Sequence, residues 1–152
     1  CEGLVGSEMC IRDSGNTICE ADHLFATRLW QNNSKVHFDI NAREDKKRLI
    51  YGGHIISLVR ALSFNGLENA QVIVGINGGT HANPVFAEDT IYCWSEVLDK
   101  IDLNVRNIAA LRLRSVGTKE KNHNMRVKSD DGKYLPTIVL DFDYWVLVPK
   151  EL

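Results

Sequence analysis

The sequence lacks the features that mark a membrane-spanning, nucleic-acid-binding or disulfide-stapled protein. The apolar run Ile50–Val59 is ended by Arg60 and falls short of the roughly 20 residues that a membrane helix needs. The 18 Lys and Arg residues are balanced by 20 Asp and Glu, so no bulk positive field attracts nucleic acid. Four cysteines are too few for a disulfide scaffold, and no pair has the C-x2-C spacing of a zinc site. We therefore expect no membrane or nucleic-acid partner, and free thiols in a reducing, cytoplasmic compartment.

The first 14 residues also lack any regular pattern, either strand alternation or helical period. They do not form a signal peptide, because Glu2 and Glu8 replace a basic start and no apolar stretch of about 7–15 residues follows. The run Val5–Ser14 is similar to the conceptual translation of a sequencing adaptor. We expect residues 1–14 to be a leader, either non-native or naturally disordered, and residues 15–150 to form the domain.

What remains has the composition of a single globular domain, with 44% hydrophobic and 25% charged residues. Thr17-x-x-Glu20 matches a capping box and predicts a helix that runs to Trp30 or Gln31. Helical spacing predicts that this helix buries an apolar stripe, with His23 facing elsewhere. The expected stripe consists of Ala21, Leu24, Phe25 and Leu29.

A second helix is predicted after Tyr51-Gly52-Gly53-His54, and it is the most apolar in the chain. Its apolar residues cover nearly the whole circumference: Ile55, Ile56, Leu58, Val59, Leu62 and Phe64. A helix that is apolar all round is a buried helix, enclosed by other elements.

The pattern then changes to strands. Four segments are β-branched or alternate between apolar and polar residues: 72–76, 90–101, 109–118 and 137–148. Short turns between them indicate an antiparallel sheet, and Gly78-Gly79 predicts a bulge or a close approach to the backbone. Helices followed by strands indicate an α+β fold. A curved antiparallel sheet wrapped around the central buried helix is a hotdog fold, and we expect such a sheet to pair with a second hotdog unit.

Two histidines are candidates for chemistry by position. His37 follows the first helix, and His54 stands at the start of the second, after two glycines. A helix N-terminus offers unpaired N–H groups that suit an oxyanion, although the glycines could serve close packing alone. His37, Asp39, His54 and His81 could form a metal set, but their spacing does not support one, so we expect no metal. Cys93 lies mid-strand and is expected to pack as a small hydrophobe.

Several motifs resemble one family. Thr17–Ala26, Val36-His37-Phe38-Asp39 and Ile50–Gly53 are similar to a MaoC-like hydratase domain. Longer motifs resemble the C-terminal hotdog half of mesaconyl-CoA hydratases, equivalently β-methylmalyl-CoA dehydratases: Tyr51–Leu58, Leu62–Leu67, Ile76–His81, Tyr92–Leu98, Ala110–Arg114 and Val139–Tyr144.

This resemblance implies reversible addition of water across the 2,3-double bond of an enoyl-CoA thioester, without a cofactor. His37 matches the family's catalytic histidine, and the amide of Gly53 matches its oxyanion donor. The family's catalytic Asp falls at Asn32, whose amide cannot accept a proton as a carboxylate does. Several alternatives follow. Asn32 could orient the water while His37 acts alone, or Asp39 or Asp22 could replace the missing carboxylate. This half could also be catalytically weak, or Asn32 could be only the C-cap of the first helix.

The implied substrate is a short, branched dicarboxylyl-CoA, with Gly52, His54, Arg60 and His81 as its binding residues. Arg60 is the candidate for the free carboxylate, because a buried Arg needs an anionic partner; a structural ion pair is the alternative. The expected partners are the acyl-CoA and a second hotdog unit, in a homodimer or as an N-terminal half absent from this sequence. The alternatives are an (R)-specific 3-hydroxyacyl-CoA dehydratase, a non-catalytic CoA-binding half, and a thioesterase.

Overall fold

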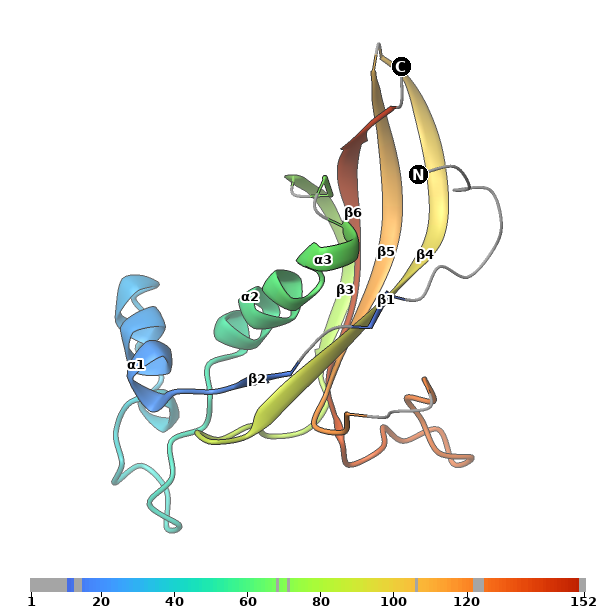
Figure 1. The fold of residues 1–152 in the computed structure, drawn as a ribbon. Helices are drawn as coiled ribbons and strands as arrows, with labels where there is room; N and C mark the ends of the chain where they lie inside the picture. The colour runs from blue at the N-terminus through green and yellow to red at the C-terminus, as the bar shows by residue number, and fades with distance from the viewer. Residues whose placement is uncertain are drawn as a thin grey trace.

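The computed structural model describes residues 11–12, 15–67, 69–70, 72–105, 107–121 and 125–150 (Figure 1). Most of the expected leader, with Cys1 and Cys10, lies outside these residues, so that expectation stays a prediction. Within the leader, strand β1 (Ile11–Arg12) pairs antiparallel with β4 (Thr90–Val105). No described helix is long and apolar enough to cross a membrane.

One antiparallel sheet organises the described chain. Its order is β1-β4-β5-β6-β3, with β2 (Asn16–Thr17) also paired to β4. The other strands are β3 (Val72–His81), β5 (Ile108–Thr118) and β6 (Ile138–Pro149). The alternation predicted for β6 is confirmed from Leu140 to Val146, where the even-numbered residues are buried. It fails at the start of the strand, because Val139 is buried too and Ile138 packs in a separate cluster with Trp94 and Val116. The bulge predicted at Gly78-Gly79 matches a register shift in the β3–β6 pairing between Ile76 and Gly78.

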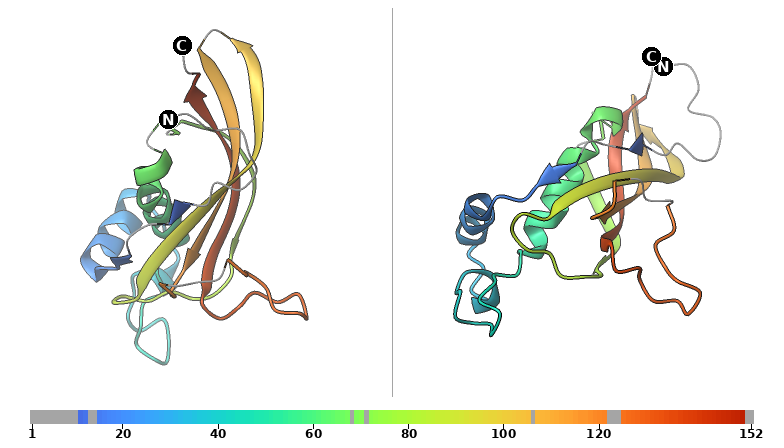
Figure 2. Two further views of the ribbon diagram at one scale, coloured as in Figure 1. Left: turned by 45° about the vertical axis from the view of Figure 1, so that its right-hand side comes forward. Right: turned by 60° about the horizontal axis from the view of Figure 1, so that its bottom comes forward.

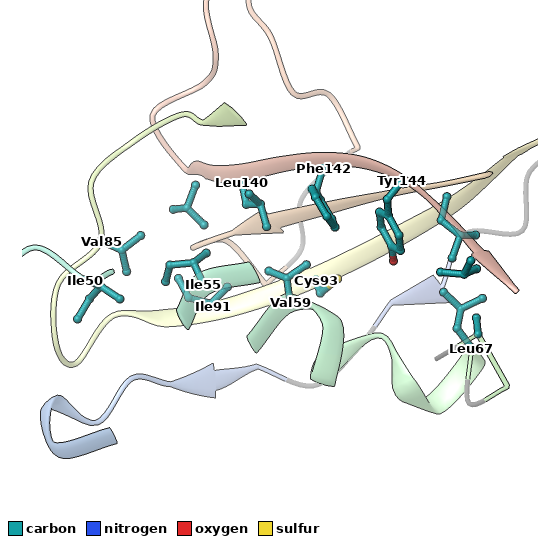
Figure 3. Packing of buried hydrophobic residues seen from close by; sticks show 14 of the residues in the cluster. Ile50, Ile55, Val59, Leu67, Val85, Ile91, Cys93, Leu140, Phe142 and Tyr144 are labelled. Atoms are coloured by element: carbon teal, nitrogen blue, oxygen red, sulfur yellow. The ribbon is translucent and has the colours of Figure 1, made fainter. Parts of the chain in front are cut away.

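The helices all lie on one side of the curved sheet (Figure 2). Helix α2 (Gly52–Leu62) packs on the sheet, and α1 (Glu20–Leu29) lies beyond it. The short helices are η1 (Lys35–His37) and α3 (Phe64–Leu67). Ile55 and Val59 join a row of buried strand side chains that includes Leu140 and Phe142 (Figure 3). The sheet curved around a central helix confirms the predicted hotdog fold.

Close contact between α2 and β5 depends on a glycine. A Cβ at Gly117 would lie 2.8 Å from Cγ2 of Val59. The expectation that α2 is enclosed on all sides is wrong, however. Only Ile55 and Val59 are buried in the helix, and Phe64, now in α3, is 54% exposed. The sheet covers one face of α2, and the rest of the helix is half-buried or, at Ser57 and Ala61, exposed.

The first helix is turned differently from its prediction. Thr17 does not cap it: this residue lies in β2, where its hydroxyl hydrogen-bonds the Thr90 hydroxyl at 2.8 Å, and the N-cap residue is Cys19. The apolar stripe is also wrong, since Phe25 and Leu29 are 62% and 61% exposed. The buried face instead carries His23 and Thr27. These two polar side chains can be buried because the Thr27 hydroxyl donates to the His23 carbonyl and His23 Nε2 accepts the Tyr51 N–H.

Candidate active site

A cavity of about 550 Å³ opens at the N-terminus of α2. Its lining combines η1, the segment before α2, the start of α2, the end of β3 with the chain that follows it, and one residue of β6. The lining residues are His37, Leu49, Ile50, Tyr51, Gly52, Gly53, Ile55, His81, Ala82, Asn83, Pro84, Val85 and Val139. The structure thus brings together four of the predicted site residues, His37, Gly52, Gly53 and His81. Among the described residues, the lining contains no Asp, Glu, Lys or Arg, so the titratable groups seen there are two imidazoles and the Tyr51 phenol.

His37 is held in a defined orientation. Its Nδ1 lies 2.8 Å from the carbonyl oxygen of Leu49, which can only accept. The proton of the neutral ring is therefore on Nδ1, and Nε2 carries the free lone pair. The Leu49 amide donates to the Val36 carbonyl at 2.9 Å, which ties η1 to the same segment. His37 is thus built as a proton acceptor at Nε2 on the wall of the cavity.

The start of α2 supplies hydrogen-bond donors. The amides of His54 and Ile55 both reach the Tyr51 carbonyl. Gly52 and Gly53 occupy the first two helical positions, where the helix offers no carbonyl to their N–H groups. A Cβ at Gly52 would lie 2.6 Å from His81 Nε2, and one at Gly53 would lie 2.6 Å from the Tyr51 ring. Glycines at these positions let two ring systems lie against the helix end, and the free amides suit an oxyanion.

Behind this helix end lies His23, a residue absent from the predicted site. Its Nε2 accepts the Tyr51 N–H at 2.9 Å and lies 3.2 Å from the Thr27 hydroxyl. Burial, with smaller contributions from His54 and His37, lowers the pKa of His23 to about 4. His23 and Thr27 are four residues apart and therefore lie on one helix face, but this spacing does not distinguish a buried pair from a solvated one. Hydrophobic periodicity does not count such a polar pair as core.

Asn32 lies outside the cavity lining and shapes a turn. The backbone N–H of Asn32 donates to the Thr27 carbonyl, and the backbone N–H of Gln31 donates to the Arg28 carbonyl. Gln31 has a φ of 53°. These two bonds form a Schellman motif, so the C-cap is Trp30, not Asn32. The Oδ1 of Asn32 accepts the Ser34 N–H at 2.9 Å. Its side chain therefore directs the chain from α1 into η1, which carries His37.

Neither carboxylate considered as a substitute for the family's Asp lines the cavity. Asp39 accepts the Asn41 N–H at 2.8 Å and thereby stabilises a turn. Asp22 is exposed on α1, where its charge raises the pKa of His54 against the larger lowering by burial. The described side chains of the lining that can exchange a proton are therefore the imidazoles of His37 and His81 and the phenol of Tyr51.

Two other predicted binding residues also lie outside the lining. The His54 ring faces His23 on α1, with 6.2 Å between ring centroids. Arg60 donates to the Tyr144 hydroxyl at 2.9 Å and to the Ala70 carbonyl at 2.6 Å, so its hydrogen-bond partners among the described residues are neutral. Tyr144 lies at the opposite end of the core from Ile50, which lines the cavity (Figure 3). Their roles in binding substrate stay predictions that this geometry does not support.

Comparisons with known proteins confirm the resemblance. No protein-family model matches the chain. A mesaconyl-CoA hydratase of Cereibacter sphaeroides is 58% identical over 136 residues, and a β-methylmalyl-CoA dehydratase of Chloroflexus aurantiacus is 52% identical over 141. Each match covers 90% of this chain, which spans only 40% of the length of either relative.

Solved structures agree on the fold. A putative MaoC domain dehydratase from Chloroflexus aurantiacus is 47% identical, with a TM-score of 0.87, over 95% of this chain and 44% of that one. An (R)-hydratase from A. caviae, with a TM-score of 0.62 at 16% identity, covers 94% of this chain and 96% of its own and supports the fold alone.

Proposed function

We propose that this chain is the hotdog unit of a hydro-lyase that adds water to, or removes it from, the 2,3-double bond of a short, branched dicarboxylyl-CoA resembling mesaconyl-CoA. The observation that carries the proposal is the pairing, in one cavity, of the His37 imidazole with the amide end of α2. The names of the two relatives support this activity and substrate class.

The geometry suits a stepwise proton transfer. Nε2 of His37 takes a proton from water, whose oxygen forms a bond to C3 of the thioester. The electrons of the double bond move towards the thioester carbonyl, and the amides of Gly53 and Gly52 stabilise the developing oxyanion. The imidazolium then returns a proton to C2 on the same face, which restores the carbonyl and the neutral ring. The bond from Nδ1 to Leu49 keeps the ring in the required tautomer.

Two other functions compete with this one. An (R)-specific 3-hydroxyacyl-CoA dehydratase would use the same cavity for plain acyl chains. A non-catalytic CoA-binding half is favoured by Asn32, because a turn-forming amide stands where the family has its acid.

A substrate panel separates these functions. We expect the ultraviolet absorbance of the conjugated thioester to fall faster with mesaconyl-CoA than with crotonyl-CoA. Faster loss with crotonyl-CoA would favour the plain-chain dehydratase. Binding by calorimetry without turnover would favour the non-catalytic half, and release of free CoA thiol would indicate a thioesterase.

A second hotdog unit is the partner that the surface supports. Strand β3 ends the order of the described sheet and is an edge. Val72, Val74 and Ile76 on this edge are 54–64% exposed. A long apolar edge strand exposed to water invites pairing with another strand. The relatives are more than twice as long as this chain, which leaves room in them for another unit.

Self-association through β3 is testable by one charge. We expect the chain to dimerise, and Ile76→Asp to raise the dimer dissociation constant by at least roughly 10-fold, because a charge would be buried in the interface. Analytical ultracentrifugation measures this constant. Asn104→Asp adds the same charge on the exposed β4–β5 hairpin and serves as the control. A wild-type chain that stays monomeric, or an Ile76→Asp variant that dimerises normally, contradicts the assignment of this edge.

A further inference from the structure

The most unusual polar group in the described chain is the His23 imidazole. Its relative exposure is 0%, and Nδ1 has no hydrogen-bond partner among the described residues. An orphaned buried polar atom costs stability, and a leucine at this position would avoid that cost. A histidine here is explained by what its other nitrogen does.

That nitrogen binds the start of α2. Nε2 accepts the backbone N–H of Tyr51, the N-cap residue, at 2.9 Å. An N-cap amide normally has no partner within its own helix. Here α1 supplies the acceptor, across 28 positions of sequence. The bond holds the Ile50–Tyr51 peptide, one residue before Gly52 and Gly53, which line the cavity.

The contact also defines the charge state of the ring. Because Nε2 accepts a hydrogen bond, the proton of the neutral ring must be on Nδ1. A second proton on Nε2 would point at the Tyr51 N–H, which is also a donor, and the hydrogen bond would be lost. The groups facing the ring agree with a neutral state. The imidazoles of His37 and His54 lie 6.4 Å and 6.2 Å from it between ring centroids. Arg48 also disfavours a charge on the ring, whereas Glu20 favours it. A neutral His23 leaves His37 free to become the cation during turnover.

We propose that His23 is a positioning residue, which holds the N-terminus of α2 through the Tyr51 amide so that the Gly52 and Gly53 amides meet the thioester oxygen. This inference rests on the proposed hydratase function. Beyond that function, His23 on α1 holds the oxyanion site in place without touching the substrate.

Kinetics of three variants test the inference. His23→Leu removes the acceptor, His23→Gln keeps an acceptor in the side chain, and Val59→Ala weakens α2 at a buried position remote from its N-terminus. Under conditions where all are folded, we expect His23→Leu to lower kcat roughly 10-fold with little change in KM, because a misplaced donor penalises the transition state. His23→Gln should recover most of kcat, and Val59→Ala should stay within about 3-fold of wild type. A wild-type kcat in His23→Leu, or an equal loss in Val59→Ala, overturns the inference.

Amide hydrogen exchange separates failure of the inference from failure of the proposed function. If the wild-type chain hydrates no enoyl-CoA, the proposed function fails, and the contact is still measured directly by the exchange rate of the Tyr51 amide. We expect that amide to exchange at least roughly 10-fold faster in His23→Leu than in wild type or Val59→Ala, because its acceptor is gone. Equal rates in the three proteins overturn the positioning role whatever the activity.

Discussion

Replacing His37 by Asn is expected to lower kcat for hydration of mesaconyl-CoA by about 10²–10⁴-fold, the usual contribution of a general acid–base group. Asn is chosen because it removes the proton acceptor Nε2 and keeps a donor. Its side-chain N–H₂ can replace Nδ1 as donor to the Leu49 carbonyl, which His37 contacts at 2.8 Å. The variant thus keeps the hydrogen bond between residue 37 and Leu49 and loses only Nε2. The measurement is the rate at which the conjugated thioester absorbance falls.

The matched control is Lys35→Ala, at an exposed position of the same short helix η1. We expect it to retain wild-type kcat, since its side chain does not line the cavity. Calorimetric binding of a CoA thioester should survive in both variants, because the fold and the cavity are preserved. Unchanged turnover in His37→Asn would remove His37 from the mechanism and leave only the fold assignment.

The strands were predictable because their packing follows side-chain alternation. Leu111 and Leu113 face the core while Arg112 and Arg114 face outward, as the period of two requires. On the outer face, Arg114 is bidentate to Asp141 and Arg112 to Asp143, which explains the acidic positions of β6. Pattern and packing agree over residues 111–114 because one side of this stretch is core and the other carries ion pairs. Further along the same outer side, Val116 is buried in a second cluster with Trp94.

The helices were predicted less well, for a different reason. A capping-box pattern at Thr17 competes with strand pairing, and the pairing with β4 prevailed. Phe25 and Leu29 have the spacing of a buried stripe, yet they are exposed in this chain. Sequence periodicity reports which residues are apolar and does not report which partner covers them. A second hotdog unit is one way to cover such a surface.

The candidate site was predictable in part. Motif resemblance identified His37 and Gly53, and the structure brings both to one cavity. It did not identify His23, since a histidine beside threonine on a helix resembles a solvated pair until the fold buries it. The same holds for Arg60, where an anionic partner was expected and the structure supplies a hydroxyl and a carbonyl. Such hydrogen bonds depend on tertiary approach and not on local spacing.

Acidification is expected to destabilise the chain between about pH 6.5 and pH 4 through the titration of buried histidine. The pKa of His23 falls from 6.5 to about 4 on folding, chiefly through burial. Between pH 6.5 and pH 4 the unfolded chain therefore takes up a proton at His23 and the folded chain does not. The contribution of His23 to the free energy of unfolding is constant above pH 6.5 and is lost as the pH falls through this window. At about 1.4 kcal/mol per pKa unit, His23 accounts for about 3 kcal/mol. Burial also lowers the pKa values of His54 and His81, which act in the same direction.

Urea unfolding at several pH values, followed by tryptophan fluorescence, measures this loss. His23→Gln cannot take up a proton at this position, so the dependence of its unfolding free energy on pH between 6.5 and 4 should be much shallower than that of wild type. Val59→Ala lowers the unfolding free energy through a cavity and should keep the wild-type pH dependence, which separates titration from weakened packing. Parallel pH profiles for wild type and His23→Gln would mean that the ring is not held neutral against the Tyr51 amide. In that event the tautomer on which the positioning argument depends would be wrong as well.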